Sequence, residues 1–261
     1  MAPATLKDRL ARGETVFTAW SHITSAHLAG VIAGAGYSDV TFDMQHGAHD
    51  ERSVFEGIAA VRRAGTSATV RVPVARWDMV SRALDFGAGA VIAPMINSLA
   101  DAQALPPPSK YPPLGARSWG PGRAMELDGD AAGYAAGSTG FLLAQNDRTL
   151  ALAMIETKGA MAALDGILAV DGIDGVFVGP ADLSIALNGG AGVEPLGDAV
   201  TQAASHIAAR AAAAGKFAAI FCVDPAWAQR YRAMGFQLQA LMADSDLIRA
   251  GAKAALAAAS R

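Results

Sequence analysis

The chain has 261 residues, of which 52% are hydrophobic and 17% charged, so it is long enough to bury a sizeable core. Its formal net charge is −3 and no run of Lys or Arg exceeds two residues, which argues against a surface for nucleic acid or an anionic membrane. Cys222 is the single cysteine, so no disulfide can form within the chain. The sequence shows neither the apolar core of a signal peptide nor the roughly 18 apolar residues of a membrane span, so we expect a cytoplasmic protein.

Apolar, β-rich segments alternate with alanine-rich segments of helical period along the chain. Most of the β-rich segments are continuously apolar, which is typical of parallel strands buried on both faces. We predict strands at 15–20, 38–44, 68–73, 90–94, 150–156, 175–179, 217–222 and 236–242. We predict helices near 25–34, 51–64, 76–86, 129–144, 158–170, 197–214, 224–234 and 244–259.

Eight strands that alternate with eight helices favour a closed (β/α)8 TIM barrel, which takes about 250 residues, and we expect 1–261 to form one such domain. An open doubly wound sheet is the alternative. The chain lacks a dinucleotide-binding glycine motif between a predicted strand and helix, which counts against it.

The alternation breaks at 105–123, LPPPSKYPPLGARSWGPGR. Its prolines predict a long loop without regular structure. The loop follows the predicted strand 90–94 and carries Arg117, Trp119 and Arg123. A segment that helps to close an active site and a plain solvent-exposed loop are both compatible with this pattern.

Active sites of barrels form at the carboxyl ends of the strands, so the polar residues at these ends are the candidates for chemistry. They are Trp20, Asp43, Gln45, His46, Arg71, Glu156, Asp182 and Asp244. The other histidines, His22, His27, His49 and His206, lie on or beside predicted helices and are weaker candidates.

His46 and Arg71 suit proton transfer and anion binding. An imidazole with an ordinary pKa near 6.5 exchanges protons at neutral pH. Arg71 lies between apolar residues of a predicted strand, where a guanidinium needs an anion. That anion is either a substrate carboxylate or enolate oxygen, or the carboxylate of Asp43 or Asp182 in a structural ion pair.

Glu156 and Asp182 follow neighbouring predicted strands and are expected to meet at the mouth of the barrel. Paired carboxylates favour a hard divalent cation such as Mg²⁺ or Mn²⁺. The alternative is that both residues simply cap or start helices.

The strings Asp43-x-x-His46-Gly47, Arg71-Val-Pro, Met-Ile-Glu156-Thr and Val-Phe-Val-Gly-Pro-Ala-Asp182-Leu-Ser together resemble the metal-dependent (class II) pyruvate aldolases of the hydroxy-ketoacid aldolase family, over about residues 5–255. The resemblance implies a barrel of the phosphoenolpyruvate/pyruvate type whose last helix is swapped between subunits of a hexamer. It also implies a divalent cation, Mg²⁺, Mn²⁺ or Co²⁺.

The resemblance further implies roles for individual residues. Glu156 and Asp182 would hold the cation, and the backbone at Gly179, Ala181 and Asp182 would bind the pyruvate carboxylate. Arg71 would bind the 2-oxo oxygen. His46 would belong to the base, which would act through a metal-bound water, and Asp85 of a neighbouring subunit would orient His46. Asp43 would be a further catalytic residue. Trp20 would shape the aldehyde pocket.

One position departs from the family pattern, because Gln45 stands where the family has glutamate. This removes a negative charge near the cation and leaves the expected ligands intact. The implied activity is cleavage and formation of 4-hydroxy-2-oxo acids, giving pyruvate or hydroxypyruvate and an aldehyde. A decarboxylase of 2-oxo diacids such as oxaloacetate, a more distant acyl-CoA lyase and a non-catalytic 2-oxo acid binding protein remain alternatives.

Overall fold

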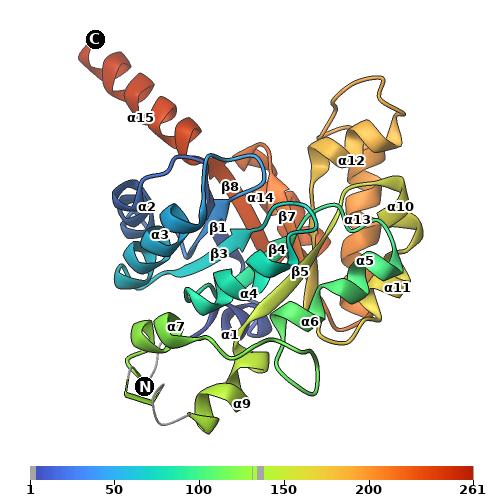
Figure 1. The fold of residues 1–261 in the computed structure, drawn as a ribbon. Helices are drawn as coiled ribbons and strands as arrows, with labels where there is room; N and C mark the ends of the chain where they lie inside the picture. The colour runs from blue at the N-terminus through green and yellow to red at the C-terminus, as the bar shows by residue number, and fades with distance from the viewer. Residues whose placement is uncertain (1–3, 131, 134–137, 261) are drawn as a thin grey trace.

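The strands of the computed structural model, which describes residues 4–130, 132–133 and 138–260, close into a barrel (Figure 1). All neighbouring strands are parallel and paired in chain order, and the last strand pairs with the first. The strands are β1 (Val16–Ser21), β2 (Asp39–Asp43), β3 (Ser67–Arg71), β4 (Ala90–Ala93), β5 (Leu150–Ile155), β6 (Gly175–Val178), β7 (Phe217–Cys222) and β8 (Leu238–Ala243). Each agrees with a predicted strand to within two residues at either end, so the predicted closed barrel is confirmed.

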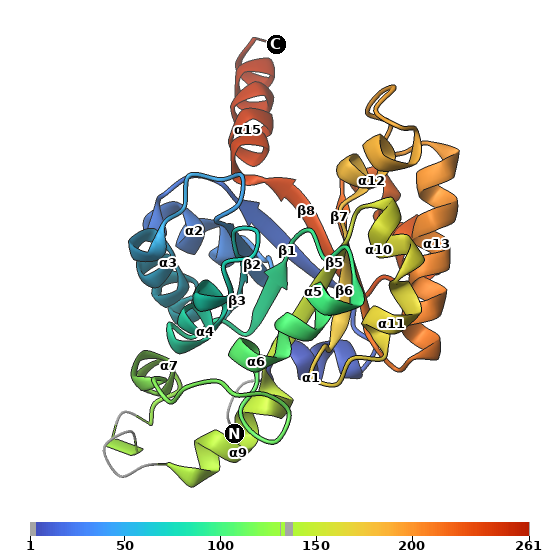
Figure 2. The ribbon, with the colours of Figure 1, turned by 45° about the vertical axis from the view of Figure 1, so that its right-hand side comes forward.

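Helices follow the strands and surround the barrel (Figure 2). Those that correspond to predicted helices are α2 (Ala26–Gly34), α3 (Glu51–Arg63), α4 (Trp77–Asp85), α10 (Lys158–Ala162), α11 (Leu164–Leu168), α13 (Asp198–Ala213), α14 (Ala228–Met234) with the preceding 3-10 turn η1 (Pro225–Trp227), and α15 (Asp244–Ala259). Part of the predicted helix 129–144, residues 131 and 134–137, lies outside the described residues, and α9 spans Thr139–Arg148.

Side chains of each strand alternate between the barrel interior and the layer beneath the helices. On β5, Leu150, Leu152 and Met154 belong to the interior cluster, whereas Ala151 and Ala153 belong to the outer one. The outer cluster contains the apolar faces of α3, α4, α11 and α13, so the continuously apolar strands are buried on both sides as predicted.

The interior of the barrel is polar along β2 and β3 and at Thr18 of β1. Val40 and Phe42 of β2 face outward, which places Asp39, Thr41 and Asp43 inside. By the same alternation Thr18 of β1 and Ser67, Thr69 and Arg71 of β3 are interior residues. Thr18 and Thr41 share a hydrogen bond of 2.7 Å, and Ser67 donates to Asp39 at 2.6 Å. This polar side leads to the carboxyl ends of the strands at Asp43 and Arg71.

The amino-terminal helix α1 (Leu6–Ala11), which was not predicted, closes the barrel at the amino-terminal ends of the strands. Its buried residues Leu6 and Leu10 join the interior cluster with Val16, Leu150 and Leu238. A capping box at Thr5 starts the helix, since its hydroxyl accepts from the Asp8 amide and the Asp8 carboxylate accepts from the Thr5 amide.

The segment 105–123 differs from the prediction in structure and in place. α5 (Leu99–Ala104) separates it from β4, α6 (Pro106–Ser109) lies within it, and α7 (Gly122–Leu127) begins in it, because proline is tolerated in the first turn of a helix. Lys110 donates to the carbonyl oxygen of Thr149, the residue before β5, at 2.7 Å. The segment therefore lies at the amino-terminal ends of the strands, and the idea that it closes the site of its own chain is wrong.

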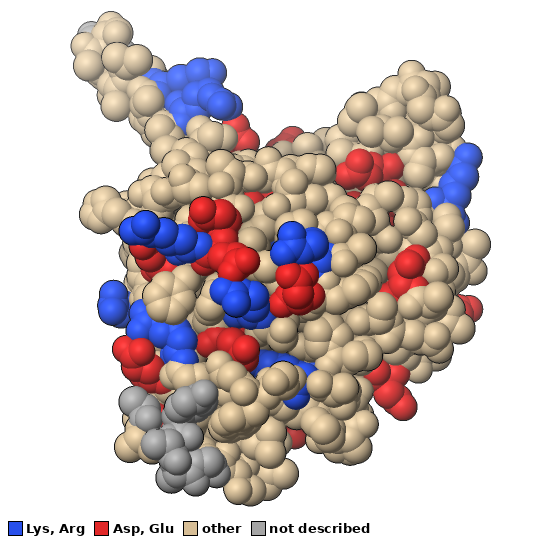
Figure 3. All heavy atoms as spheres, viewed as in Figure 1, with Lys and Arg blue, Asp and Glu red and all other residues tan. Residues whose placement is uncertain are grey.

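α15 leaves the barrel at the opposite end and projects from it (Figures 1 and 2). Asp244, its first residue, is buried, whereas almost all residues after Leu247 are exposed, including Ile248 and Leu256. Residues 254–260, the last described part of the chain, include no Lys, Arg, Asp or Glu, and the described outer end of the helix is uncharged on the face in Figure 3. On that face of the molecule, side chains of both signs lie next to one another rather than in a single basic patch.

Candidate active site

The predicted site residues, Asp85 excepted, gather at the carboxyl ends of the strands. Trp20 lies near the end of β1, Asp43 and Arg71 end β2 and β3, and His46 lies in the loop after β2. Glu156 follows β5 directly, and Gly179, Ala181 and Asp182 stand at the start of α12 (Pro180–Leu187), which follows β6.

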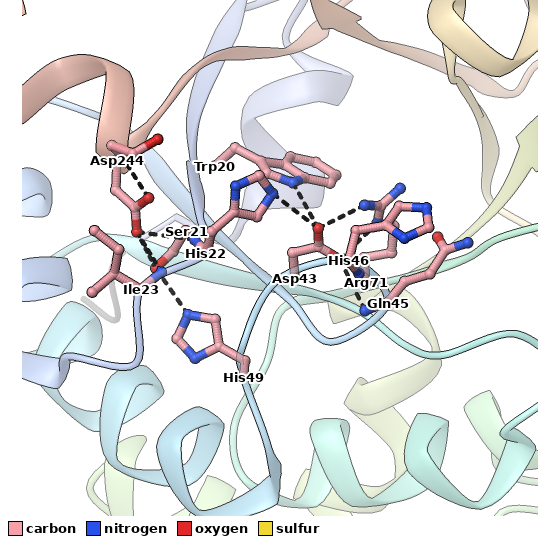
Figure 4. A network of polar contacts seen from close by, with 11 residues as sticks. Trp20, Ser21, His22, Ile23, Asp43, Gln45, His46, His49, Arg71 and Asp244 are labelled. Atoms are coloured by element: carbon pink, nitrogen blue, oxygen red, sulfur yellow. Dashed lines mark hydrogen bonds and ion pairs between the residues drawn. The ribbon is translucent and has the colours of Figure 1, made fainter. Parts of the chain in front are cut away.

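The Asp43 carboxylate is the centre of a hydrogen-bond network (Figure 4). Three donors reach each oxygen. Oδ1 accepts from the Gln45 amide (3.0 Å), the His46 amide (3.3 Å) and Arg71 Nε (2.9 Å). Oδ2 accepts from Trp20 Nε1 (3.2 Å), His22 Nε2 (3.1 Å) and Arg71 Nη2 (2.6 Å).

This network fixes the charge of Asp43. Burial alone would raise the pKa of Asp43, but the hydrogen bonds from His22 and Arg71 and the Arg71 charge outweigh it and hold this pKa well below its usual range. Asp43 is therefore a permanent anion that positions Arg71 and the loop carrying His46, and it does not exchange protons near neutral pH. Of the two carboxylates considered as partners of Arg71 in the sequence analysis, the structure pairs it with Asp43 and not with Asp182. Arg71 Nη1 has no hydrogen-bond partner among the described residues.

Trp20 forms an aromatic wall inside the mouth of the barrel. Its ring lies 5.6 Å from Phe177 of β6 and 5.3 Å from Phe221 of β7, measured between centroids. The Arg71 guanidinium carbon lies 4.9 Å from the Trp20 centroid, so the cation is held both by a carboxylate and by a ring face. Trp20 thus links the polar side of the mouth, at β1 to β3, to its apolar side.

His46 and Gln45 extend from the same loop with unused hydrogen-bonding groups. The His46 side chain is exposed and makes no hydrogen bond or ion pair with any described residue of the chain. The Gln45 Oε1 atom is buried and likewise lacks a partner within the described part of the chain. The predicted base is at the mouth, but nothing in its own chain orients its ring.

His22, which the sequence analysis ranked low, belongs to the site. It was placed beside the helix 25–34, yet it follows β1 directly and its ring contacts Asp43. The usable signal was its position two residues after Trp20, at the end of a strand. That position marks a side chain near the mouth of a barrel as well as the start of a loop.

Glu156 and Asp182 form the candidate metal site. Glu156 is buried, and its Oε1 accepts from the Met95 amide at 2.7 Å, whereas Oε2 has no hydrogen-bond partner among the described residues. Burial raises the pKa of Glu156, and the Asp182 charge raises it further. Asp182 is exposed and lies in the first turn of α12, but its side chain does not cap the helix, so the alternative that Asp182 is a helix cap is wrong.

The start of α12 lies tightly against Glu156. A Cβ atom on Gly179 would lie 2.7 Å from Glu156 Oε2 and 3.0 Å from Met154 Cε, so a larger residue would displace the carboxylate. Pro180 occupies the first helical position, where the missing N–H is not needed. The amides of Ala181 and Asp182 follow, and they have no acceptor within the helix.

Asp85 lies elsewhere. It ends α4 near the amino-terminal ends of the strands, and its Oδ1 accepts from Arg117 Nη2 at 2.6 Å. Burial raises the pKa of Asp85, while the Arg117 charge opposes this effect. Asp85 and His46 of the same described chain do not contact each other. This agrees with the prediction that Asp85 lies on the far side of the barrel from His46.

A second network, centred on Asp244, adjoins the first (Figure 4). Asp244 Oδ2 accepts from the amides of His22 and Ile23, both at 2.9 Å, and from the Ser21 hydroxyl at 3.2 Å. Ser21 also contacts His49 Nε2 at 3.0 Å. The first residue of the projecting helix α15 therefore holds the backbone of the loop that carries His22.

The described residues contain no group of three or more His, Cys, Asp or Glu side chains that could hold a metal ion. The pair Glu156 and Asp182 still fits a divalent cation of the Mg²⁺ type, which binds through one or two carboxylates and takes its other ligands from water and substrate. No described helix is both long and apolar enough to cross a membrane.

Comparison with known proteins connects this geometry to an enzyme family. The family model described as HpcH/HpaI aldolase/citrate lyase matches residues 17–250. A hydroxypyruvate/pyruvate aldolase of Rhizorhabdus wittichii is 35% identical over 94% of this chain and 94% of that protein. A 2-keto-3-deoxy-L-rhamnonate aldolase of Klebsiella pneumoniae is 32% identical over 92% of this chain and 87% of that protein.

A solved structure shows the same fold. It is an HpcH/HpaI aldolase/citrate lyase family protein from Burkholderia cenocepacia, with a TM-score of 0.84 and 28% identity, and the match covers 98% of this chain and 99% of that one.

Proposed function

Because the chain belongs to the HpcH/HpaI aldolase/citrate lyase family, we propose that this carbon–carbon lyase cleaves and forms 4-hydroxy-2-oxo acids, giving pyruvate or hydroxypyruvate and an aldehyde. The observation that carries the proposal is the arrangement at the mouth of the barrel. Two carboxylates, Glu156 and Asp182, form no ion pair with any described residue, and they lie at the carboxyl ends of β5 and β6. The guanidinium of Arg71 is held by Asp43 at the end of β3.

A divalent cation, Mg²⁺, Mn²⁺ or Co²⁺, would be held by Glu156 and Asp182. When bound, it would supply a Lewis acid that lowers the energy of an enolate oxygen. The unpaired Glu156 oxygen and the mutual repulsion of the two carboxylates support this assignment, because a cation satisfies both.

The remaining groups bind and deprotonate the 2-oxo acid. The amides of Ala181 and Asp182, with Gly179 kept small in front of Glu156, receive the substrate carboxylate at the start of α12. Arg71 Nη1 donates to the 2-oxo oxygen, and the charge of Arg71 stabilises the enolate as it forms. His46 removes the proton from C3, and the carbanion then attacks the aldehyde carbon.

The exposed helix and the isolated His46 support a homo-oligomer. α15 is swapped onto a neighbouring subunit in this proposal, and Asp85 of one subunit orients His46 of another within a hexamer. The exposed apolar residues Ile248 and Leu256 of α15 support the first part. The lack of a partner for the His46 ring within the described chain supports the second. A cytoplasmic location stays a prediction.

The function is tested by turnover with pyruvate or hydroxypyruvate and a panel of aldehydes, before and after chelation. We expect activity to be abolished by chelation and restored by Mg²⁺, Mn²⁺ or Co²⁺. Glu156→Gln keeps the shape of the side chain and should bind the cation more weakly in calorimetry, with Glu194→Gln on the exposed loop after α12 as the control.

Activity that is undiminished in a verified metal-free preparation would overturn the assignment of Glu156 and Asp182. Oxaloacetate decarboxylation without any aldol turnover would favour the decarboxylase. Binding of pyruvate with neither reaction would favour a non-catalytic 2-oxo acid binding protein.

A further inference from the structure

The ring of His22 is held at the mouth by a carboxylate. Its Nε2 lies 3.1 Å from Asp43 Oδ2, and Asp43 is a permanent anion, so Nε2 carries a hydrogen and donates. Nδ1 is then the nitrogen that gains and loses a proton. Among the described residues it has no partner, and Figure 4 shows it on the side of the ring away from Asp43. The side chain is 37% exposed, so a small molecule can reach it.

The orientation of His22 is determined from two further sides. Asp244 Oδ2 accepts from its amide at 2.9 Å, which fixes the backbone after β1. Gly47 packs beneath the ring, since a Cβ atom there would lie 3.1 Å from His22 Cα and 3.2 Å from its Cδ2. His46 has no comparable support within the described chain. His22 is therefore a preorganised imidazole at the mouth of the barrel.

The charged groups that shift the pKa of His22 are Asp43, Asp244 and Arg71. The Asp43 hydrogen bond raises the pKa of His22, burial lowers it, the charges of Asp43 and Asp244 raise it, and Arg71 lowers it. The net pKa lies above the ordinary histidine value. His49 lies just before α3 and contacts Ser21 at the end of β1, and burial lowers its own pKa, so it adds little positive charge. An imidazole can act both as a proton donor and as a proton acceptor.

The topology places His22 opposite the candidate metal site. In the closed order β1 to β8, β5 stands four strands from β1 in either direction. Glu156 follows β5 and His22 follows β1, so the two side chains flank the mouth from opposite sides. In the proposed function the 2-oxo acid binds at Glu156, so we place its reacting carbon in the space between these two residues. The second substrate must enter that space, on the side of Trp20 and His22.

We propose that His22 is a catalytic residue that exchanges a proton with the aldehyde oxygen. In the aldol addition reaction, C3 of the enolate forms a bond to the aldehyde carbon, and the carbonyl π electrons move to the aldehyde oxygen. His22 Nδ1–H then transfers its proton to that oxygen. In cleavage, neutral Nδ1 takes the proton from the 4-hydroxyl while the C3–C4 bond breaks and its electrons return to the enolate. The hydrogen bond from Nε2 to Asp43 is kept in both directions.

This assignment rests on the proposed aldol function and divides the reaction between two histidines. His46 acts on C3 of the 2-oxo acid, and His22 acts on the oxygen of the aldehyde. The two steps can be measured separately, because pyruvate exchanges its methyl hydrogens with heavy water when no aldehyde is present.

The experiment uses His22→Gln, whose amide can still donate to Asp43 but cannot titrate. His27→Gln, at an exposed histidine on α2, is the matched control. For His22→Gln we expect aldol addition and cleavage to fall by roughly 10²-fold or more, the range for loss of a general acid or base. The rate of methyl hydrogen exchange should stay close to that of the wild type. His27→Gln should change neither rate.

Equal losses of exchange and aldol turnover in His22→Gln would show that His22 only supports Arg71 and Asp43, and the proposal would fail. Unchanged aldol turnover would also overturn it. If His22→Gln does not fold, His22→Asn is measured in the same way. A wild-type protein that shows neither exchange nor aldol turnover would instead refute the proposed function.

The pH dependence of cleavage gives an independent readout. Since neutral His22 is the base, wild-type kcat for cleavage should rise with pH through the raised pKa of His22. His22→Gln should lack this rise, whereas His27→Gln should keep it. A rise of the same size and position in His22→Gln would assign it to another group and overturn the role of His22.

Discussion

Replacement of Asp43 by asparagine tests how strongly the central network stabilises the barrel. The change removes the charge that faces Arg71, which is only 7% exposed. It also turns one acceptor oxygen into an NH2 group that must face donors, because each Asp43 oxygen accepts from Arg71 and from two further N–H groups. Removing one partner of a buried ion pair costs about 3–5 kcal/mol. We therefore expect Asp43→Asn to lower the free energy of unfolding by about 3–5 kcal/mol at pH 7.

Urea unfolding of wild type and variant, followed by circular dichroism, measures this difference from the midpoints at equal slope. The pKa of Asp43 determines how this difference in unfolding free energy changes with pH. The pKa of Asp43 is depressed in the folded protein, so its contribution is complete above the unfolded pKa of about 3.9 and is lost as the pH falls through the lower folded pKa. The difference between the two proteins should therefore shrink only below about pH 4.

The double variant Asp43→Asn/Arg71→Gln is the control, because it leaves no buried guanidinium without a counter-charge. Its loss of stability should be smaller than the sum of the two single losses. A loss under about 1 kcal/mol in Asp43→Asn would refute the reasoning, since it would mean that solvent already screens the pair as it does at a protein surface.

Three further predictions concern neighbouring residues. Asp39→Asn should raise the free energy of unfolding at neutral pH, because burial raises the pKa of Asp39 and its ionised form therefore destabilises the folded protein. The gain should disappear below about pH 4, where the Asp39 carboxyl is neutral in both the folded and the unfolded protein. Arg71→Lys should lower aldol turnover by at least about 10²-fold, since a single ammonium cannot both hold Asp43 by two bonds and donate to the enolate oxygen; near-normal turnover would exclude that role. Mixed oligomers of His46→Ala and Asp85→Ala should regain activity that both parents lack, and no recovery in mixed oligomers confirmed by mass spectrometry would exclude a site shared between subunits.

The sequence by itself determined the order and bounds of the strands. Runs of buried apolar residues between helix-ending glycines such as Gly65, Gly87 and Gly215 are local signals, and all three have the positive φ that favours glycine. Because barrel chemistry lies at the ends of strands, the same local reading also placed Asp43, Arg71 and Glu156 at the mouth. Polar residues occupy every second position in 39–43 and 67–71, a pattern that indicates a polar interior on these strands. The sequence analysis interpreted most strands as continuously apolar and did not predict this interior.

The partners of these residues were decided only by the tertiary structure. Whether Arg71 faces a substrate or a carboxylate depends on Asp43, which is 28 residues away in sequence and adjacent across two strands. The sequence placed His22 beside a helix, whereas the structure shows a hydrogen bond between its ring and the Asp43 carboxylate. The segment 105–123 was assigned to the wrong end of the barrel, because its direction after α5 is set by long-range contacts such as Lys110 with Thr149. Hydrogen bonds, burial and pKa shifts of this kind depend on distances between segments far apart in the chain, and local sequence patterns do not encode those distances.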